Sequence, residues 1–346
     1  MMTTDVLLRK ESGLGRIILN RPRAINALTH TMVQLIDAAL VEWADDADVR
    51  AVLITGAGER GLCAGGDIVS IYEDARSGGS ASLDFWRDEY VLNARIARYP
   101  KPYVAVMDGI VMGGGVGVSA HGSVRIVTER SVVGMPEVGI GFVPDVGGTY
   151  LLSRAPGELG THIALTTARF GAGDAVHCGF ADHFVPSASL DDFVSALSVD
   201  GLEAALSLAS AAPASALVEQ RSWIDSCYAA DSVQEIVDRL QDHDSTEAKS
   251  AAEQILGKSP TALTVTLRAL RQARRLPSLE EALDQEFRVA NAILRSHDLA
   301  EGIRAQVIDK DRDPRWKPAT LADVSTVDEY FADLGARELG LAQGEI

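Results

Sequence analysis

Two short apolar stretches, each followed by a glycine-bearing loop, constrain this chain more than any other feature of its sequence. Residues 104–107 have the pattern of a buried strand and lead to three glycines at 113–115, while residues 51–55 lead to Gly65 and Gly66. Consecutive glycines let bare backbone approach another group closely, and an N–H at a helix start has no intrahelical acceptor. The two loops therefore predict a site at which backbone N–H groups face a ligand.

The same order of strand, glycine turn and helix recurs through the first 200 residues. Residues 5–20 read as a hairpin, and a helix is expected to follow from Thr29, a suitable N-cap. Its apolar face would consist of Met32, Leu35, Ile36, Ala39, Leu40 and Trp43. These patterns predict an α/β core, a spiral of β-β-α units, over residues 1–200.

The second part of the chain has a different pattern, with almost no strand signals after about residue 201. Helical periodicity covers residues 201–211, 231–240, 245–256, 260–275 and 278–296. No Pro/Ser-rich linker separates the two parts. We therefore expect residues 201–346 to form a helical C-terminal region packed on the core. Arginines at 268, 271, 274 and 275 are expected to form a solvated face, with contact to a phosphate or a partner subunit as the alternative.

Charge and composition exclude several classes of protein. The net charge is −17 with dispersed acidic residues, which disfavours nucleic acid and anionic membrane surfaces as partners. No apolar run approaches the roughly 18 residues of a membrane span. The N-terminus has no recognisable targeting pattern, so a cytoplasmic location is expected. Three separated cysteines without a CxxC pair, and seven scattered histidines without HExxH, give no metal site and no disulfide framework.

The glycine loops admit two interpretations. Close packing of a strand on a helix would by itself explain three consecutive glycines. The functional interpretation is that the N–H groups of Gly66 and Gly114 converge on one oxygen, because two donors are what a carbonyl becoming an oxyanion needs. Each such donor is worth roughly 3 kcal/mol of the barrier when it is correctly aimed. The dinucleotide pattern G-x-G-x-x-G fails, because its last position from Gly113 is Val118.

Three carboxylates are candidates for chemistry, each with a plainer alternative. Glu137 follows Pro136 among apolar residues, which favours a general acid or base, although a buried and satisfied glutamate is an equal alternative. For Asp145 alone a helix N-cap is the better interpretation, and for Glu89 a solvated helix face is the default. No Gly-x-Ser-x-Gly elbow is present, which disfavours a serine hydrolase.

Taken together, these loops resemble the crotonase (enoyl-CoA hydratase/isomerase) superfamily. The matching stretches are residues 20–28, 63–68, 112–115 and 136–137. The resemblance implies a β-β-α spiral fold and an acyl-CoA ligand, with the thioester oxygen between the N–H groups of Gly66 and Gly114. It also implies CoA binding around Arg23, Ala24, Ala64, Gly65, Asp67 and Ile68. Trimer-based assembly is frequent in that superfamily, so a homo-oligomer is an expectation by analogy.

Further stretches resemble one branch, the 3-hydroxyisobutyryl-CoA hydrolases, over nearly the whole chain. They are residues 85–90, 139–148, 258–261, 301–305, 308–311 and 314–318. By the pattern of that branch, Glu89, Gly114, Glu137 and Asp145 contact the substrate. Hydratases place a second glutamate just after the triple glycine, where this chain has Gly117. This departure favours hydrolysis over the addition of water to a double bond.

The resemblance implies an acyl-CoA thioester hydrolase that acts on 3-hydroxyisobutyryl-CoA or a similar short β-hydroxyacyl-CoA, as in valine catabolism. Glu137 would attack the thioester or activate water, Asp145 would hold or protonate the thiolate side, and Glu89 would recognise the β-hydroxyl. No metal or redox cofactor is implied, since CoA is part of the substrate. The alternatives are a hydratase or isomerase of the same fold and a non-catalytic acyl-CoA-binding protein.

Overall fold

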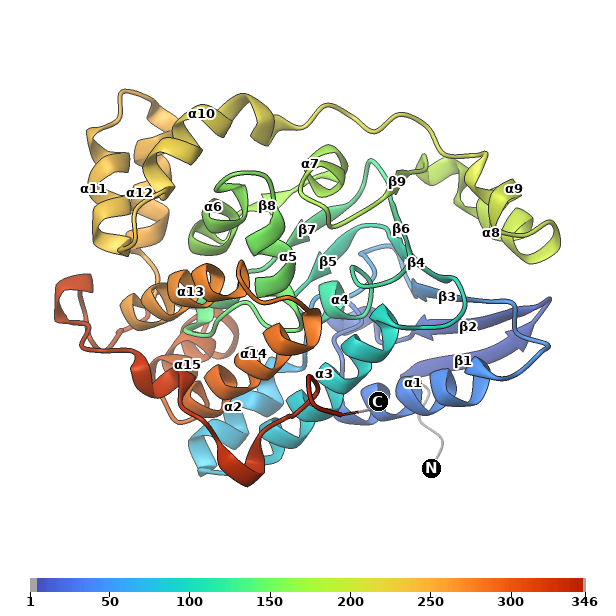
Figure 1. The fold of residues 1–346 in the computed structure, drawn as a ribbon, viewed down its shortest axis with the longest axis horizontal. Coiled ribbons are helices and arrows are strands. Elements are labelled where there is room, and N and C mark those ends of the chain that lie inside the picture. Colours follow the sequence, from blue (N-terminus) through green and yellow to red (C-terminus); the bar gives the residue numbers. More distant parts are fainter. Residues whose placement is uncertain (1–4, 345–346) are drawn as a thin grey trace. The chain divides into compact units, whose positions relative to one another are not determined.

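Parallel strands that follow one another in chain order form the framework of the computed structural model, which describes residues 5–344 (Figure 1). The larger sheet has the order β1-β2-β3-β4-β6-β9, and a smaller sheet has the order β5-β7-β8. The strands are β1 (Val6–Glu11), β2 (Leu14–Leu19), β3 (Ala51–Gly56), β4 (Tyr103–Met107), β5 (Ile110–Met112), β6 (Val124–Val127), β7 (Val132–Gly134), β8 (Arg169–Phe170) and β9 (His183–Phe184).

Successive pairs of strands show how the chain winds. After the antiparallel β1–β2 hairpin, every neighbour in the larger sheet pairs in parallel. β4 and β6 enter the larger sheet, whereas β5 and β7, which directly follow them, pair with each other in the smaller one. Two turns of the chain, β4–β5 and β6–β7, thus each add one strand to both sheets. The predicted spiral of β-β-α units is confirmed.

Helices supply the return segments and almost all of the later chain. They are α1 (His30–Ala44), α2 (Ile68–Ser77), α3 (Ala81–Ala97), α4 (Gly114–Gly117), α5 (Gly148–Arg154), α6 (Leu159–Thr166), α7 (Ala172–His177), α8 (Leu190–Val199), α9 (Leu202–Leu206), α10 (Ala216–Tyr228), α11 (Val233–Asp242), α12 (Thr246–Leu256), α13 (Pro260–Ala273), α14 (Leu279–Ile293) and α15 (His297–Ile303). The predicted helical C-terminal region is confirmed.

The chain divides into two compact units whose segments alternate along the sequence. Unit 1 comprises the residues up to Gly66, Asp88–Gly134 and Arg169–Ala216, and unit 2 comprises Asp67–Arg87, Met135–Ala168 and the residues from Leu217 onward. Every strand within residues 5–344 belongs to unit 1. This division differs from a single boundary at residue 200, because two loop-and-helix segments of the first half group with the later helices. The division into a spiral core over residues 1–200 and a helical region over residues 201–346 packed on it stays a prediction.

One face of the larger sheet is buried under α8 and α9 in unit 1. Leu53, Val106 and Ile126 of three adjacent strands form one apolar cluster with Phe193 and Leu197 of α8. These side chains are at most 7% exposed, so the strands are fixed on this face by close packing. The loops that leave the strand ends therefore start from a rigid base.

Local predictions for the first helix hold with one correction. The Thr29 side chain caps α1 by accepting a hydrogen bond from the N–H of Met32, as expected. Leu35, which was assigned to the apolar face, is 36% exposed and is corrected to a surface position. α8 was not predicted as a separate helix, and α10 was missed. Polar residues in and around both helices weaken the helical periodicity of their apolar residues.

The arginine cluster of α13 is not simply a solvated face, which corrects the expectation. Arg271 and Arg274 both bind the carboxylate of Glu158, at 2.7 and 3.0 Å, and Arg271 also donates to the backbone oxygen of Tyr228. The pKa of Glu158 is lowered, because hydrogen bonds from Thr161 and both arginines outweigh the effect of its burial. The cluster is therefore partly a structural ion-pair network within unit 2.

The three cysteines, Cys63, Cys178 and Cys227, are buried free thiols. Across residues 5–344, none of the helices combines the length and the apolar character that a membrane crossing requires.

His162 gives unit 2 a pH-dependent stability that can be measured. Its ring packs edge-on against Trp223 and Tyr228, and Nδ1 lies 2.9 Å from the Tyr228 hydroxyl. Burial lowers the pKa of His162 to about 4. Below about pH 6.5 the imidazole of His162 becomes protonated in the unfolded state but stays neutral in the folded state. The free energy of unfolding therefore falls as the pH drops from 6.5 toward 4. The free energy of unfolding should lose up to about 3 kcal/mol through this residue.

Chemical denaturation of the wild type and His162→Gln between pH 7 and pH 4.5 checks this expectation. As the pH falls, the free energy of unfolding of the wild type should decrease more than that of the variant, because glutamine does not titrate. A difference that stays constant over this range would contradict it.

Candidate active site

In unit 1 the two glycine loops lie against each other. The Cys63 N–H donates to the Ile110 oxygen and the Met112 N–H to the Cys63 oxygen, so the loop before Gly66 runs beside β5 like an extra strand. β5 leads directly through Gly113, whose φ of +51° is in the left-handed region, into Gly114 at the start of α4. The predicted partners Gly66 and Gly114 are thereby brought together by strand-like pairing.

Three groups lie around the position that a side chain on Gly114 would occupy: the Glu89 carboxylate, the Leu28 side chain and the Gly66 nitrogen. A methyl group placed there would lie 2.6 Å from Oε1 of Glu89, 3.2 Å from Cδ1 of Leu28 and 3.4 Å from the backbone nitrogen of Gly66. Within residues 5–344, the N–H groups of Gly66 and Gly114 donate no hydrogen bond to the chain. The Gly66 nitrogen thus lies close to Gly114, and the convergence of the two amides on one substrate oxygen stays a prediction.

Glu89 is a buried residue, which corrects the default expectation of a solvated helix face. It is 2% exposed on α3, and its carboxylate oxygen is the closest group to the open position at Gly114. A carboxylate at this depth is a strong acceptor for a hydroxyl donor. The substrate contact of Glu89 stays a prediction.

Asn93 lies one helical turn after Glu89 and was missed by the sequence analysis. Its side chain is fully buried, and neither amide atom has a hydrogen-bond partner within the described residues 5–344. Buried amides are almost always satisfied, by protein or by water, so this one suggests an additional polar group at this part of α3. An asparagine within an apolar-aromatic helix was the only available signal.

The loops expected to hold CoA are joined to each other in unit 1. The Ala64 N–H donates to the Ile25 oxygen at 2.9 Å, and the Leu28 N–H donates to the Gly65 oxygen at 2.8 Å. Arg23 and Ala24 lie in a short 3₁₀ turn just before this pairing, with the Arg23 side chain exposed. Four of the six predicted CoA contacts are therefore neighbours, while Asp67 and Ile68 open α2 in unit 2.

Glu137 occupies the first position of a 3₁₀ turn, η2 (Glu137–Ile140), in unit 2 and is 7% exposed. α15 packs onto this turn backbone to backbone. A Cβ on Gly141 would lie 2.3 Å from the Asp298 oxygen, and one on Gly302 would lie 2.3 Å from the Ile140 carbonyl. The two glycines thus permit a contact that fixes the turn, as expected for a residue that must be held in one orientation.

An aromatic pair borders the same turn. The Phe142 N–H donates to the Glu137 oxygen at 3.0 Å, and the Phe142 ring stacks on Trp86 of α3 with centroids 5.0 Å apart. These apolar rings lower the local polarity around the segment that carries Glu137. The apolar environment inferred from the sequence around Glu137 is therefore present.

Asp145 is 5% exposed and does not cap a helix, so the N-cap interpretation is wrong. The N-cap of α5 is Gly147, and the Gly148 N–H donates to the backbone oxygen of Asp145 at 2.6 Å. Between them, Val146 has a φ of +52°, which is rare for a β-branched residue. A buried acid on a constrained turn is a pattern found at functional sites.

Glu286 on α14 is a buried acid that the sequence analysis missed. It is 1% exposed and accepts hydrogen bonds from the backbone N–H groups of Gly147 and Thr149. The available signal was its position beside Leu283 and Phe287, on the buried face of an amphipathic helix. A glutamate on the buried face of a helix is unusual, because glutamate is rarely fully buried without a partner.

Other reactive groups near these loops have plainer roles. Burial raises the pKa of the Cys63 thiol to about 12, so it carries no thiolate at neutral pH. Among residues 5–344, no group of three or more histidine, cysteine, aspartate and glutamate side chains is arranged to hold a metal ion.

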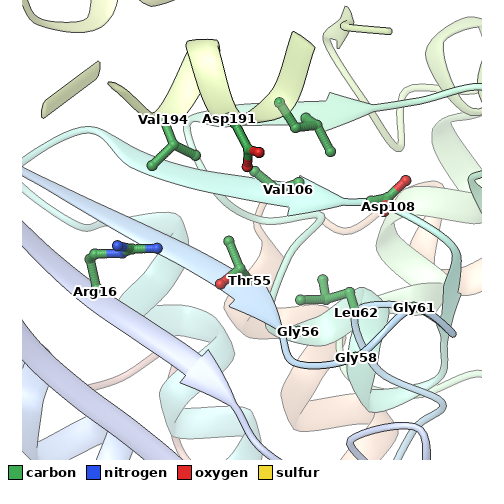
Figure 2. Close-up of a pocket in the computed structure, with 11 residues that line it drawn as sticks. Arg16, Thr55, Gly56, Gly58, Gly61, Leu62, Val106, Asp108, Asp191 and Val194 are labelled. Carbon is green, nitrogen blue, oxygen red and sulfur yellow. The ribbon is translucent and has the colours of Figure 1, made fainter. Parts of the chain in front are cut away.

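Figure 2 shows a separate cavity of about 350 Å³ in unit 1, near the ends of β3 and β4 and beside the start of α8. None of the predicted site residues lines it. Two of its lining side chains have partners in the chain: Arg16 pairs with Glu11 at 2.6 Å, and Asp108 binds Thr128 and Arg130. The cavity is therefore a feature apart from the predicted site.

Two relatives with established names align over nearly the whole chain. A Danio rerio protein named "3-hydroxyisobutyryl-CoA hydrolase, mitochondrial" is 43% identical over 352 residues, which span 98% of this chain and 92% of that protein. The Rattus norvegicus protein of the same name is 42% identical and is covered over 91% of its length.

Two solved structures are similar in fold over the same extent. The structure titled a carnitinyl-CoA dehydratase from Mycobacterium thermoresistibile has a TM-score of 0.95 and 57% identity, covering 99% of this chain and 100% of that one. The structure titled an enoyl-CoA hydratase from Rhodobacter sphaeroides has a TM-score of 0.92 and 45% identity, covering 97% and 99%.

The expectation of a cytoplasmic location is contradicted by these comparisons. The relatives from Danio rerio and Rattus norvegicus are both named as mitochondrial proteins. The reason for the error is that a missing targeting pattern was treated as evidence of a compartment, although the fold and the site carry no such information.

A sequence profile described as Enoyl-CoA hydratase/isomerase matches residues 14–331, which include every residue assigned above to the predicted site. The matched range also contains both sheets apart from the beginning of the first hairpin. This chain belongs to the enoyl-CoA hydratase/isomerase family, the crotonase superfamily.

Proposed function

We propose that this protein is an acyl-CoA thioester hydrolase that cleaves 3-hydroxyisobutyryl-CoA to 3-hydroxyisobutyrate and CoA. The observation that carries the proposal is the confined space at Gly114, where two available amides and the Glu89 carboxylate lie together. Relatives at 42–43% identity bear the name of this hydrolase. The substrate class then places the reaction in valine catabolism. Release of free thiol from 3-hydroxyisobutyryl-CoA, followed with a thiol-reactive dye, tests the activity.

The proposed reaction uses backbone amides and carboxylates. The N–H groups of Gly66 and Gly114 would receive the thioester oxygen as it gains negative charge. Glu137 would either attack the carbonyl carbon, which expels the CoA thiolate and leaves a mixed anhydride for water to cleave, or deprotonate a water that attacks instead. Asp145 would supply the proton that the departing sulfur takes up. CoA enters as part of the substrate, and we propose no further cofactor.

Glu89 is proposed to select the hydroxylated acyl chain. Its carboxylate oxygen borders the same position at Gly114 that the thioester carbonyl would approach. A hydroxyl two carbons from that carbonyl would be within reach of a buried acceptor. A hydrogen bond to a charged acceptor is stronger than one to a neutral acceptor. A hydrogen bond from the substrate hydroxyl to the Glu89 carboxylate would therefore account for a preference for 3-hydroxyacyl over plain acyl chains.

A second activity is favoured by the titles of the two solved structures, which name a dehydratase and a hydratase at 57% and 45% identity. Against it stands Gly117, a buried residue of α4 at the position where hydratases carry their second glutamate. Loss of the enoyl absorbance band on mixing enzyme with crotonyl-CoA would favour hydration. Thiol release from the 3-hydroxyacyl-CoA with no change in that band would favour hydrolysis.

A homo-oligomer is proposed only by analogy with the superfamily.

Replacing Glu137 with glutamine should lower kcat for thiol release at least about 100-fold, the scale of a lost acid–base or nucleophilic group. KM should change little, because the thioester is still held by the amide donors. Glu42→Gln is a matched control, since this α1 side chain is 64% exposed and remote from the proposed chemistry. Full activity in Glu137→Gln would end the proposed mechanism. In a single turnover in labelled water, oxygen-18 in Glu137 would identify the anhydride route.

Glu89→Ala should reduce kcat/KM for 3-hydroxyisobutyryl-CoA about 10- to 100-fold, the scale of a hydrogen bond to a charged group. The value for isobutyryl-CoA, which lacks the hydroxyl, should fall much less. Parallel measurements of thiol release on the two substrates give the ratio directly. Equal losses on both substrates would remove Glu89 from hydroxyl recognition.

Gly114→Ala should reduce kcat/KM at least about 100-fold, comparable to the loss of an oxyanion-hole donor. The added methyl would lie 2.6 Å from Glu89 Oε1 and 3.4 Å from the Gly66 nitrogen, so these groups would have to move away from their positions beside Gly114. Gly257→Ala is the control, because a methyl there meets only ordinary contacts of 3.6 Å or more. If Gly114→Ala kept wild-type turnover with an unchanged melting temperature, the assigned oxygen site would be wrong.

A further inference from the structure

Glu286 binds the turn that follows Asp145 through both of its carboxylate oxygens. Oε2 accepts the Gly147 N–H at 2.7 Å, and Oε1 accepts the Thr149 N–H at 2.9 Å. The Thr149 hydroxyl also donates to Oε1. Thr149 is fully buried and Glu286 is 1% exposed, so water does not compete for these bonds.

This turn needs an outside acceptor because it cannot cap itself. α5 begins with N–H groups that have no intrahelical partner, and its N-cap, Gly147, has no side chain to accept them. Val146 and Gly147 are both left-handed, with φ of +52° and +77°. For a β-branched residue this conformation is strained and persists only when surrounding contacts hold it. Glu286, 139 residues further along the chain, supplies those contacts.

We propose that Glu286 is a positioning residue for Asp145: by capping α5 from a neighbouring helix, it holds the Val146–Gly147 turn in the conformation that presents the Asp145 carboxylate. The inference rests on the proposed function, because it assigns Glu286 a part in the reaction only through Asp145. It extends the site to α14, whose residues none of the sequence motifs singled out.

The electrostatics agree with the close approach of the two acids. Burial raises the pKa of Glu286 to about 8, with the negative charge of Asp145 contributing to the same shift, and the hydrogen bonds from Thr149 and Gly147 oppose it. Two carboxyl groups that share a buried region cannot both ionise without cost.

The same helix provides a matched control. Asp284, two residues before Glu286, is 8% exposed and also accepts two backbone N–H groups, those of Leu341 at 2.9 Å and Ala342 at 3.1 Å. It therefore resembles Glu286 in residue class, burial and the kind of bonds it makes. The difference is that Asp284 holds the C-terminal segment, whereas Glu286 holds the turn of Asp145.

The test is a set of thiol-release kinetics with 3-hydroxyisobutyryl-CoA on the full chain. Glu286→Ala should lower kcat about 100-fold with KM within about threefold, the cost of a catalytic group displaced by about 1 Å. Glu286→Gln should recover kcat to within about tenfold of the wild type, since its amide oxygen still accepts one N–H. Asp284→Asn should leave kcat within about threefold, even if it lowers the melting temperature.

A double-mutant cycle separates positioning from simple support of the fold. In an Asp145→Asn background, Glu286→Ala should lower kcat by less than about threefold, because there is no acid left to position. An equal loss in both backgrounds, or a loss matched by Asp284→Asn, would overturn the inference and leave the proposed hydrolysis intact. Full kcat in Asp145→Asn alone would overturn it through its premise. Absence of thiol release in the wild type would instead overturn the proposed function.

Discussion

The site depends on the absence of a side chain at Gly114. A Cβ at this position would lie 2.6 Å from Oε1 of Glu89, 3.2 Å from Leu28 and 3.4 Å from the Gly66 nitrogen. The backbone achieves this by running the 62–66 loop alongside β5 as if it were another strand, so that two loops from different turns of the spiral end at one spot. In the proposed mechanism, the winding of the fold sets the spacing of the two amide donors, and glycine leaves the position beside them without a side chain.

Carboxylates complete the proposed chemistry, and the structure holds each one differently. Glu89 is fixed by its helix, and Glu137 by a 3₁₀ turn against which α15 packs through Gly141 and Gly302. Asp145 lies on a turn that is strained by itself and is held by a second buried acid, Glu286. Since a catalytic group displaced by about 1 Å can lose two orders of magnitude in rate, these supports matter as much as the identity of the acids.

The sequence predicted the spiral, the α1 cap at Thr29 and the glycine loops because each follows from local rules that a few neighbouring residues satisfy. It predicted Glu89 and Asp145 as a solvated residue and a helix cap when these were considered alone, and both proved to be buried. Their burial comes from segments far away in the chain, which local periodicity cannot report. Glu286 and Asn93 were missed for the same reason. The alternation of chain segments between the two compact units likewise cannot be predicted from the pattern of a few neighbouring residues.

The bond between Gly147 and Glu286 joins positions 139 residues apart, which has a consequence for how the enzyme matures. A nascent chain can wind both sheets and bring together the two amide donors long before α14 has left the ribosome. At that stage it would already present a pocket for a thioester oxygen, yet the turn bearing Asp145 would lack its anchor. The anchor of the Asp145 turn would then be the last of these contacts to form during synthesis.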